Sequence, residues 1–303
     1  MALLLTSTPE RQVVWRAAFA AAGEPFFASE AEVTDPGAVT QIACWTPPAD
    51  LSRYPNLDCV ICVGAGTDHL SDLPEGVTLV RTLSPGLDAM VRDWVTMAAL
   101  CLHRDLPAYV DQARRGAWQA RPVRTARSRR VGIMGMGRIG ALAAESLRSL
   151  GFEVEGYSRS GRGPGGIKVH GADGIGAFLA RSDLLVCLMP LTDQTRGALN
   201  DALFAALPPG AMLVHAGRGA QLDMDAMRRA LDAGHLSTAM LDVTNPEPLP
   251  PDHWAWTDPR VIVTPHVAAQ TDAADGAAFA LQVVAAARAG MPLPGVVDRG
   301  LGY

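Results

Sequence analysis

The segment 135–140 constrains the fold of this 303-residue chain more than any other part of its sequence. Its sequence, GMGRIG, follows the short apolar run Arg130–Met134 and opens the helix-forming run Ala141–Leu150. A second apolar run, Phe152–Tyr157, comes at the spacing of a strand–helix–strand unit. In such a unit the first glycine permits a tight turn, the second lets the backbone approach a pyrophosphate, and the third lets helix and strand pack closely. The segment therefore predicts a parallel sheet that binds a dinucleotide at the start of a helix.

The rest of the chain also alternates short apolar runs with helical stretches, which predicts parallel sheets covered by helices. At this length two domains are expected. The last helix can return to the first domain, so that two crossings join the halves around a cleft. The expected strands lie at 3–5, 42–45, 57–63, 77–80, 184–188, 211–215, 238–243 and 261–264, and the expected helices at 87–103, from there to about Trp118, and at 273–289.

Composition excludes several classes of partner. The formal net charge of −5 gives no reason to expect nucleic acid, since phosphate binding needs a basic surface. The arginine-rich run 121–130 is expected to be a solvated connector ahead of a strand. No stretch approaches the roughly 18 uninterrupted apolar residues of a membrane span, and the apolar start Met1–Leu5 lacks the basic flank of a signal peptide. No membrane partner and a cytoplasmic location are therefore expected.

The five cysteines are an odd number scattered through hydrophobic segments, which suits reduced thiols. Cys59 and Cys62 have the spacing of a redox or metal pair, but they lie inside a strand-like run. No second pair of Cys or His is placed to complete a zinc site. Both are therefore expected in the core, and no metal is predicted.

The residues after the second strand of the glycine unit distinguish the two nicotinamide cofactors. NAD sites usually place Asp or Glu there to bind the ribose 2′-hydroxyl. This chain has Ser158, Arg159 and Ser160 instead. A carboxylate would repel a 2′-phosphate, whereas serine and arginine can donate hydrogen bonds to it. The sequence therefore predicts NADP, with NADPH preferred over NADH.

Three polar residues follow predicted strands of the second half, at the edge where open α/β sheets bind ligands. They are Arg218 in HAGRG, Glu247 in NPEPLP and His266 in TPHV. A guanidinium can hold the carboxylate of a 2-oxo acid and polarise its carbonyl group. Histidine can protonate the alkoxide that hydride transfer creates, and a carboxylate on its other ring nitrogen favours the imidazolium form. Alone, each of the three could be an ordinary loop residue; the resemblance described next implies these roles for Arg218, His266 and Glu247 respectively.

In this order, and together with the glycine segment, the three residues resemble the D-isomer-specific 2-hydroxyacid dehydrogenases. The resemblance covers nearly the whole chain and is greatest to the glyoxylate/hydroxypyruvate reductase A group, through segments 44–48 (CWTPP), 63–68 (VGAGTD), 245–250 (NPEPLP) and 297–303 (VDRGLGY). It implies an α/β fold of two doubly wound parallel-sheet domains. A flavodoxin-like substrate domain would comprise 1–99 and 268–303, and a Rossmann NADP-binding domain would comprise 100–267.

The resemblance also implies the reaction, the contacts and the assembly. NADPH would reduce glyoxylate or hydroxypyruvate, and the protein would be a homodimer. The backbone N–H groups of Gly64, Ala65 and Gly66 would hold the substrate carboxylate, and Trp45 would form a pocket wall, with core packing as its alternative. The predicted cofactor contacts are Gly135, Met136, Gly137, Arg138, Ile139, Gly140, Ser158, Arg159, Ser160, Met189, Pro190, Thr195, Ala216, Gly217 and Asp242.

Two alternatives stay open at this stage. The same machinery serves other substrates in the family, such as phosphoglycerate, D-lactate or phosphite, whereas formate oxidation is disfavoured because that branch has glutamine where Glu247 stands. The family also includes corepressors, so a non-catalytic dinucleotide-sensing scaffold is the second alternative. The segment Met90–Trp94 departs from the Val-Ala-Glu-like segment of many members, which weakens any transfer of substrate detail.

Overall fold

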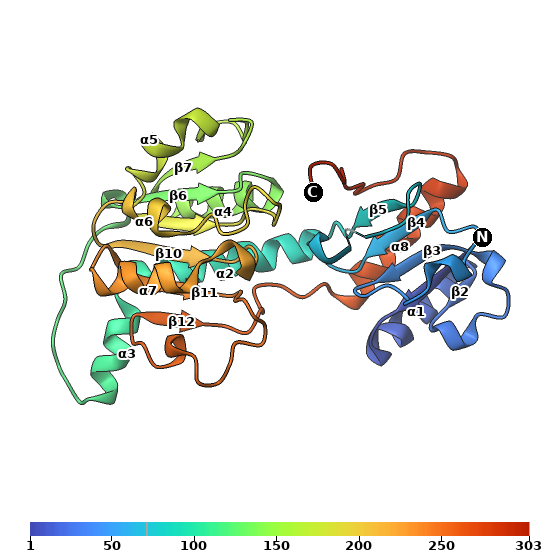
Figure 1. Ribbon diagram of the computed structural model, residues 1–303, viewed down its shortest axis with the longest axis horizontal. Helices are drawn as coiled ribbons and strands as arrows, with labels where there is room; N and C mark the ends of the chain where they lie inside the picture. The colour runs from blue at the N-terminus through green and yellow to red at the C-terminus, as the bar shows by residue number, and fades with distance from the viewer. Residues whose placement is uncertain (71, 303) are drawn as a thin grey trace. The chain divides into compact units, whose positions relative to one another are not determined.

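A computed structural model describes residues 1–70 and 72–302, which form two α/β units (Figure 1). The first unit comprises Met1–Leu87 and Gln270–Tyr303, and the second comprises Asp88–Ala269. Tyr303, the last residue of the C-terminal segment that carries part of the resemblance, lies outside the described residues. Each unit is built on a wholly parallel sheet, so the predicted α/β class is confirmed.

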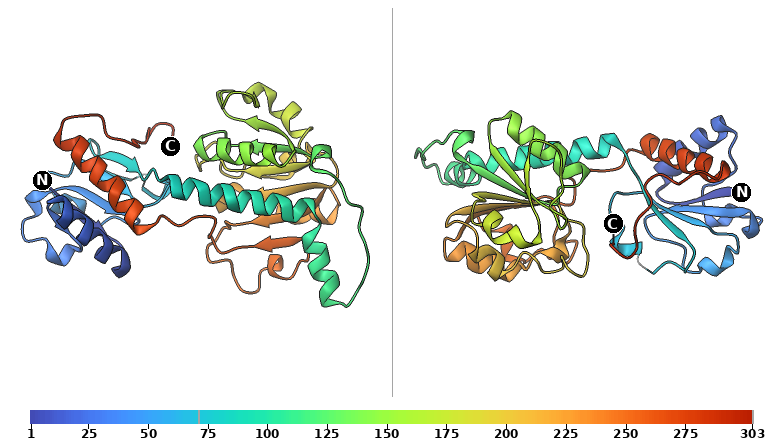
Figure 2. Two further views of the ribbon diagram at one scale, coloured as in Figure 1. Left: turned by 180° about the vertical axis from the view of Figure 1, so that it is seen from behind. Right: turned by 90° about the horizontal axis from the view of Figure 1, so that it is seen from above.

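The sheet of the first unit has five strands in the order β2-β1-β3-β4-β5. This is the flavodoxin-like order that was predicted for this part of the chain. Helices α1 and α8 pack against each other (Figure 2). Trp15 and Val283 are buried with the alternate strand residues Leu3 and Leu5. The elements are β1 (Ala2–Thr6), α1 (Pro9–Ala22), β2 (Phe26–Phe27), β3 (Val39–Cys44), β4 (Cys59–Cys62), β5 (Thr78–Arg81) and α8 (Ala273–Arg288).

The two cysteines of the Cys-X-X-Cys spacing are buried at the ends of β4. Residues three apart in a strand point to opposite faces of the sheet. Cys59 accordingly belongs to the apolar cluster beneath α1 and α8, and Cys62 to the cluster on the other face. The prediction that both are core residues is confirmed.

The sheet of the second unit has seven strands in the order β12-β11-β10-β9-β6-β7-β8. From β6 the chain adds β7 and β8 on one side and then returns to add β9 to β12 on the other, which is the Rossmann order with one further strand. Ligands of such sheets bind where the direction reverses, between β6 and β9, beyond the carboxyl ends of the strands. The strands are β6 (Arg130–Met134), β7 (Glu153–Tyr157), β8 (Lys168–His170), β9 (Leu184–Cys187), β10 (Ala211–His215), β11 (Leu236–Leu241) and β12 (Val261–Val263).

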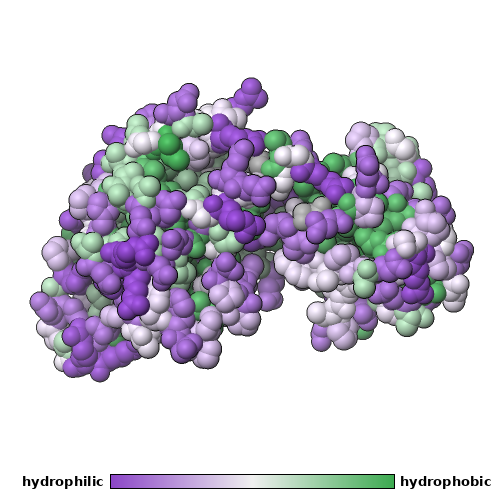
Figure 3. Space-filling model, viewed as in Figure 1, coloured by the Kyte–Doolittle hydropathy of each residue, from purple (hydrophilic) through white to green (hydrophobic). Residues whose placement is uncertain are grey.

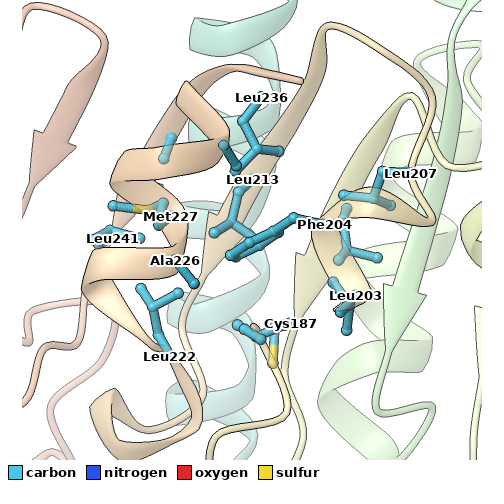
Figure 4. Packing of buried hydrophobic residues seen from close by; sticks show 14 of the residues in the cluster. Cys187, Leu203, Phe204, Leu207, Leu213, Leu222, Ala226, Met227, Leu236 and Leu241 are labelled. Carbon is cyan, nitrogen blue, oxygen red and sulfur yellow. The ribbon is translucent and has the colours of Figure 1, made fainter. Parts of the chain in front are cut away.

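Helices cover both faces of this sheet: α6 and α7 lie on the face seen in Figure 1, and α2 and α4 on the face seen from behind in Figure 2. Phe204 of α6 and Met227 of α7 are buried with Leu213 of β10 and Leu241 of β11 (Figure 4). The helices are α2 (Pro85–His103), α3 (Leu106–Arg114), α4 (Arg138–Ser149), α5 (Ile175–Leu179), α6 (Asp201–Ala205) and α7 (Met224–Asp232).

Helix α2 belongs to the second unit from Asp88 onward, earlier than residue 100, where the sequence places the boundary. Contacts with α4 account for this. Thr96 Oγ1 lies 3.0 Å from Ser146 Oγ, and Asp88 forms an ion pair with Arg138.

The helix that was expected to reach Trp118 ends earlier, at Arg114. Gly116 adopts a φ of 64°, which glycine reaches without steric cost, and its N–H group donates to the carbonyl of Ala113. Every residue from 113 to 125 is exposed, so the first part of the arginine-rich run is solvated as predicted. Its end is not, because Arg130 begins β6 and its guanidinium pairs with Asp183 at 2.6 Å.

Hydrophilic residues are spread over the surface in the view of Figure 3, with smaller hydrophobic patches between them. No helix within 1–70 and 72–302 is both long and apolar enough to span a membrane. The same residues contain no group of three His, Cys, Asp or Glu side chains able to hold a metal ion.

Candidate active site

The glycine segment joins β6 to α4 as the sequence predicts. Gly135 adopts a φ of 102°, and a Cβ there would lie 2.7 Å from the Leu188 carbonyl oxygen. A Cβ on Gly140 would overlap the carbonyl oxygen of Gly135, whereas Gly137 faces open space. Gly137 is also the N-cap of α4 and supplies no side chain to the first turn. The loop thus leaves room at the positive end of a helix, which fits the pyrophosphate of a dinucleotide.

Arg138, the first residue of α4, is tied to helix α2. Its Nη2 donates to Oδ1 of Asp88 at 3.0 Å, and the Asp88 side chain is only 4% exposed. The two residues are fifty positions apart, so no local pattern could have indicated the pair. Of the other predicted contacts here, Met136 is buried and Ile139 is half-buried.

The residues after β7 form a closed turn. Ser158 Oγ donates to the Arg162 carbonyl at 2.7 Å, and Ser160 Oγ accepts the Arg162 N–H at 3.3 Å. Arg159 and Arg162 are both exposed, and residues 157–163 contain no carboxylate. The turn therefore suits a phosphate group better than a ribose hydroxyl. The hydroxyl of Ser158 is bonded within the turn, rather than being open to a phosphate as the sequence suggested.

Five further predicted cofactor contacts lie in two adjacent loops. Met189, Pro190 and Thr195 follow β9, while Ala216 and Gly217 follow its neighbour β10. Thr195 Oγ1 donates to the Pro190 carbonyl at 2.7 Å, which closes the first of these loops. Both loops leave the sheet at the carboxyl ends of the strands.

Arg218 follows β10 and has a firmly held backbone. Its N–H donates to Gln221 Oε1 at 2.8 Å, and its carbonyl accepts from the Gln221 N–H at 3.0 Å. The same carbonyl lies 3.0 Å from Nε2 of the fully buried His215. Because a carbonyl only accepts, His215 carries a proton on Nε2. Burial lowers the pKa of His215 to about 4, so this ring is neutral near pH 7.

Glu247 and His266 meet as the sequence predicts. Glu247 Oε2 lies 2.9 Å from His266 Nδ1, and Glu247 Oε1 accepts the Thr244 N–H at 3.0 Å. An ionised carboxylate only accepts, so the proton of this contact belongs to Nδ1, and Nε2 remains for exchange with a ligand. The His266 and Glu247 side chains are 40% and 38% exposed, which leaves the pair accessible.

The loop of Arg218 and the loop of Glu247 are in direct contact. A Cβ on Gly219 would overlap the carbonyl group of Thr244, and it would lie 2.7 Å from the Asn245 nitrogen. Thr244 is the residue whose N–H holds Glu247. The three predicted catalytic residues therefore occupy neighbouring loops after β10, β11 and β12.

His266 has an unusual backbone conformation, with a φ of 52°. Non-glycine residues rarely adopt positive φ, and such residues concentrate at functional sites. The buried Asp242 stabilises the loop around it, because its carboxylate accepts from the N–H groups of Val267 and Ala268 at 2.9 and 2.8 Å and from Thr264 Oγ1 at 2.6 Å. The sequence assigned Asp242 to the cofactor, whereas here its carboxylate is bonded to the histidine loop.

The predicted substrate residues of the first unit lie together after β3 and β4. The Trp45 ring stacks on His69 with centroids 3.9 Å apart, and a Cβ on Gly64 would lie 2.8 Å from that ring. The Gly66 carbonyl accepts from Cys62 Sγ at 3.3 Å. Trp45 is 46% exposed, so the alternative of core packing for this residue is wrong.

Residues 96–268 match the family model described as D-isomer specific 2-hydroxyacid dehydrogenase, NAD binding domain. The chain is also 34% identical over 268 residues to glyoxylate/hydroxypyruvate reductase A of Salmonella newport (strain SL254), a match that covers 86% of both proteins. This chain belongs to the D-isomer specific 2-hydroxyacid dehydrogenase family. The predicted family and the predicted enzyme class, an NAD(P)-dependent oxidoreductase, are therefore confirmed.

Solved structures of this dehydrogenase family match over nearly the whole chain. A D-isomer specific 2-hydroxyacid dehydrogenase from Xanthobacter autotrophicus Py2, in complex with NADPH and MES, is 35% identical with a TM-score of 0.94, covering 100% of this chain and 99% of that one. The NADPH-dependent glyoxylate/hydroxypyruvate reductase from Sinorhizobium meliloti, in complex with NADP and sulfate, is 38% identical with a TM-score of 0.91 and the same coverage. Both complexes agree with the prediction of NADP as the cofactor.

Proposed function

We propose that this protein reduces a small 2-oxo acid, glyoxylate or hydroxypyruvate, to the D-2-hydroxy acid with NADPH. The observation that carries the proposal is the 2.9 Å contact between Glu247 Oε2 and His266 Nδ1, in a loop packed against that of Arg218. The contact pairs a proton donor with a carboxylate, and the adjoining loop carries an arginine; reduction of a 2-oxo acid calls for these three groups. The similarity to glyoxylate/hydroxypyruvate reductase A supports this choice of substrates.

The residues present fit the cofactor. Open space at Gly137 and the start of α4 suit the pyrophosphate, and the turn with Arg159 and Arg162 suits the 2′-phosphate. When bound, NADPH supplies the hydride. Of the remaining predicted contacts, the loops with Met189, Pro190, Thr195, Ala216 and Gly217 are assigned to the nicotinamide half.

Arg218 is assigned to the substrate. Its planar guanidinium can bind the carboxylate through two N–H groups and place its positive charge beside the carbonyl oxygen to be reduced. This charge favours the transition state, because electron density moves onto that oxygen as hydride reaches the carbonyl carbon. The bonds to Gln221 and His215 hold the backbone of Arg218, and its guanidinium donates from Nη1 to the Gly217 carbonyl at 2.9 Å.

His266 is assigned the proton. Hydride adds to the carbonyl carbon, the π electrons move to the oxygen, and the proton on Nε2 goes to that oxygen to complete the hydroxyl group. Glu247 holds the ring through Nδ1, which leaves Nε2 for the transfer. The left-handed backbone of His266, held by Asp242, sets the direction in which the ring leaves the chain.

Two assignments concern the rest of the protein. The backbone N–H groups of Gly64, Ala65 and Gly66 are assigned to the substrate carboxylate, with Trp45 as the wall that limits substrate size. The protein is assigned as a homodimer. The exposed segment 113–125 supports this assignment, because it carries the exposed apolar side chains of Trp118 and Val123, which a partner could cover. Light scattering that gives the mass of a single chain at micromolar concentration would contradict the dimer.

The test is cofactor oxidation with glyoxylate, hydroxypyruvate, pyruvate and phenylpyruvate, each with NADPH and with NADH. The proposal expects the highest kcat/KM with NADPH and one of the first two acids, and D-glycerate as the product from hydroxypyruvate. Fastest turnover with another acid would move the protein to another substrate within the family. NADPH binding without turnover of any acid would instead support a sensing scaffold.

A further inference from the structure

Gln221 is a fully buried polar residue that the sequence did not single out. It ends the 3₁₀ turn Gly219–Gln221, directly after Arg218. Its Oε1 accepts the Arg218 N–H at 2.8 Å, and its Nε2 donates to the carbonyls of Pro190 at 3.0 Å and Met189 at 3.2 Å. One side-chain amide therefore joins the loop after β10 to the loop after β9.

The surroundings of Gln221 leave this amide little freedom. A Cβ on Gly217 would overlap its Oε1, so the backbone of the neighbouring loop packs directly on the amide. Behind it, Leu222 and Cys187 belong to the apolar cluster of the second unit (Figure 4). The partners also fix which way the amide points, because oxygen must face an N–H group and nitrogen must face carbonyls. Turning it over would set the amide nitrogen against the Arg218 N–H group and the amide oxygen against the Met189 and Pro190 carbonyls, so all three bonds to Gln221 would be lost, at a cost for each.

The two loops that Gln221 joins carry different ligands in the proposed function. The loop after β10 carries Arg218, assigned to the acid, while the loop after β9 carries Met189 and Pro190, assigned to the cofactor. Thr195 extends the second loop through its bond to the same Pro190 carbonyl that Gln221 binds. A shift of either loop would change the distance between hydride donor and acceptor.

We propose that Gln221 is a positioning residue that holds the arginine loop in register with the cofactor loop, so that the acid and NADPH are aligned for hydride transfer. The inference rests on the proposed function. Only an amide can make all three hydrogen bonds, since it offers one acceptor and two donor hydrogens on a single planar group. Methionine keeps the length but bonds to neither loop. Glutamate keeps the acceptor for Arg218 and, when ionised, loses the donors toward Pro190 and Met189.

The chain offers a matched control in Gln41. This glutamine is likewise buried, on β3 of the first unit, and neither polar atom of its side chain has a hydrogen-bond partner among the described residues. Gln41→Met therefore makes the same chemical change without separating two loops. It is expected to leave NADPH affinity, kcat and KM unchanged.

The experiment compares Gln221→Met, Gln221→Glu and Gln41→Met in the full chain. It measures the Kd of NADPH by fluorescence without acid, then kcat and KM for the best acid, and the Tm. Gln221→Met should lower kcat/KM about 10²-fold, as loss of alignment by about 1 Å does. It should also weaken NADPH binding about tenfold, the value of one hydrogen bond to a fixed group.

Gln221→Glu separates positioning from a general loss of stability. It should weaken NADPH binding more than it raises the KM of the acid, because the Arg218 N–H keeps its acceptor. Lowering the pH protonates the glutamate and returns one donor hydrogen, so NADPH affinity relative to the unsubstituted protein should recover. If Gln221→Met does not fold, this recovery decides the matter.

The inference is overturned if the Gln221 variants change Tm alone, with Kd and KM no further from the unsubstituted protein than those of Gln41→Met. It is also overturned if the ratio of the NADPH Kd of Gln221→Glu to that of the unsubstituted protein is the same at every pH. Failure of the proposed function has a different signature, which is the absence of turnover in the unsubstituted protein. In that case the NADPH binding measurements still test the bridge between the loops.

Discussion

The α-carbon of Gly219 lies so close to the carbonyl group of Thr244 that no side chain fits between them. Thr244 in turn donates its N–H to Glu247, the partner of His266. The glycine after Arg218 is therefore the point at which the arginine loop and the glutamate loop touch. Glycine is required at position 219 because a Cβ would have to displace backbone atoms, and not because the backbone adopts a positive φ.

Gly219→Ala should separate the two loops. Overpacking of this kind costs about 1–3 kcal/mol of folding free energy, and misalignment of about 1 Å can cost about 10²-fold in kcat/KM. Urea unfolding and steady-state kinetics measure the two effects. Gly176→Ala is the control, since a Cβ at that position in α5 meets nothing within 4 Å. Equal behaviour of the two variants would show that the loops tolerate displacement.

Arg159→Asp should reverse or abolish the preference for NADPH over NADH. A carboxylate in this turn repels a 2′-phosphate and can accept a hydrogen bond from a ribose 2′-hydroxyl. The ratio of kcat/KM values for the two cofactors measures the effect. Arg127→Asp makes the same change of charge, but Arg127 precedes β6 and so lies near the amino ends of the strands, whereas Arg159 follows β7 at their carboxyl ends. It should leave the ratio unchanged. An unaltered ratio in Arg159→Asp would show that Arg159 does not contact the cofactor.

Glu247→Gln should slow the hydride step. The carboxylate that accepts from His266 Nδ1 becomes an amide that can turn either its oxygen or its nitrogen toward the ring, so the imidazole is held less firmly for proton transfer. The effect should be moderate, because both side chains are partly exposed and solvent screens their interaction. Pre-steady-state measurement of the hydride step avoids interference from cofactor release.

His266→Ala serves as the companion variant to Glu247→Gln. It should lose about 10²–10⁴-fold in turnover at every pH while NADPH binding persists. An unchanged rate of the hydride step in Glu247→Gln would show that the carboxylate has no part in proton transfer.

His215 should make the folded protein less stable as the pH falls. Its folded pKa is lowered to about 4 by burial, whereas an unfolded histidine titrates near about 6.5. Between these values only the unfolded state binds the proton, so the His215 contribution declines by up to about 1.4 kcal/mol per pH unit and is constant above that range. In His215→Asn this contribution disappears.

Urea unfolding of both proteins at pH 7.5, 6 and 5 measures the difference. The stability advantage of the unsubstituted protein should shrink toward pH 5, since groups other than His215 titrate alike in both. A constant difference would show that His215 is protonated as readily in the folded state as in the unfolded one.

The sequence alone determined the features that depend on local geometry and on residue chemistry. A glycine that must adopt φ of 102° between a strand and a helix marks the dinucleotide loop, and the lack of a carboxylate after β7 marks NADP. Arg218, Glu247 and His266 were identifiable because each follows its own strand, and parallel strands bring their carboxyl ends to one edge. Short edge strands such as β8 escaped prediction, since three residues carry too little pattern.

Only the tertiary structure decided how these residues are held. The Gln221 amide reaches carbonyls more than thirty residues earlier, Asp88 reaches Arg138 across fifty residues, and Asp242 supports a histidine loop beyond the next strand. None of these contacts has a sequence period or motif. A buried polar group is satisfied by whichever partner the fold brings within hydrogen-bonding distance, and that partner is set by the order of the strands in the sheet and by the packing of α2 against α4, not by neighbours in the chain.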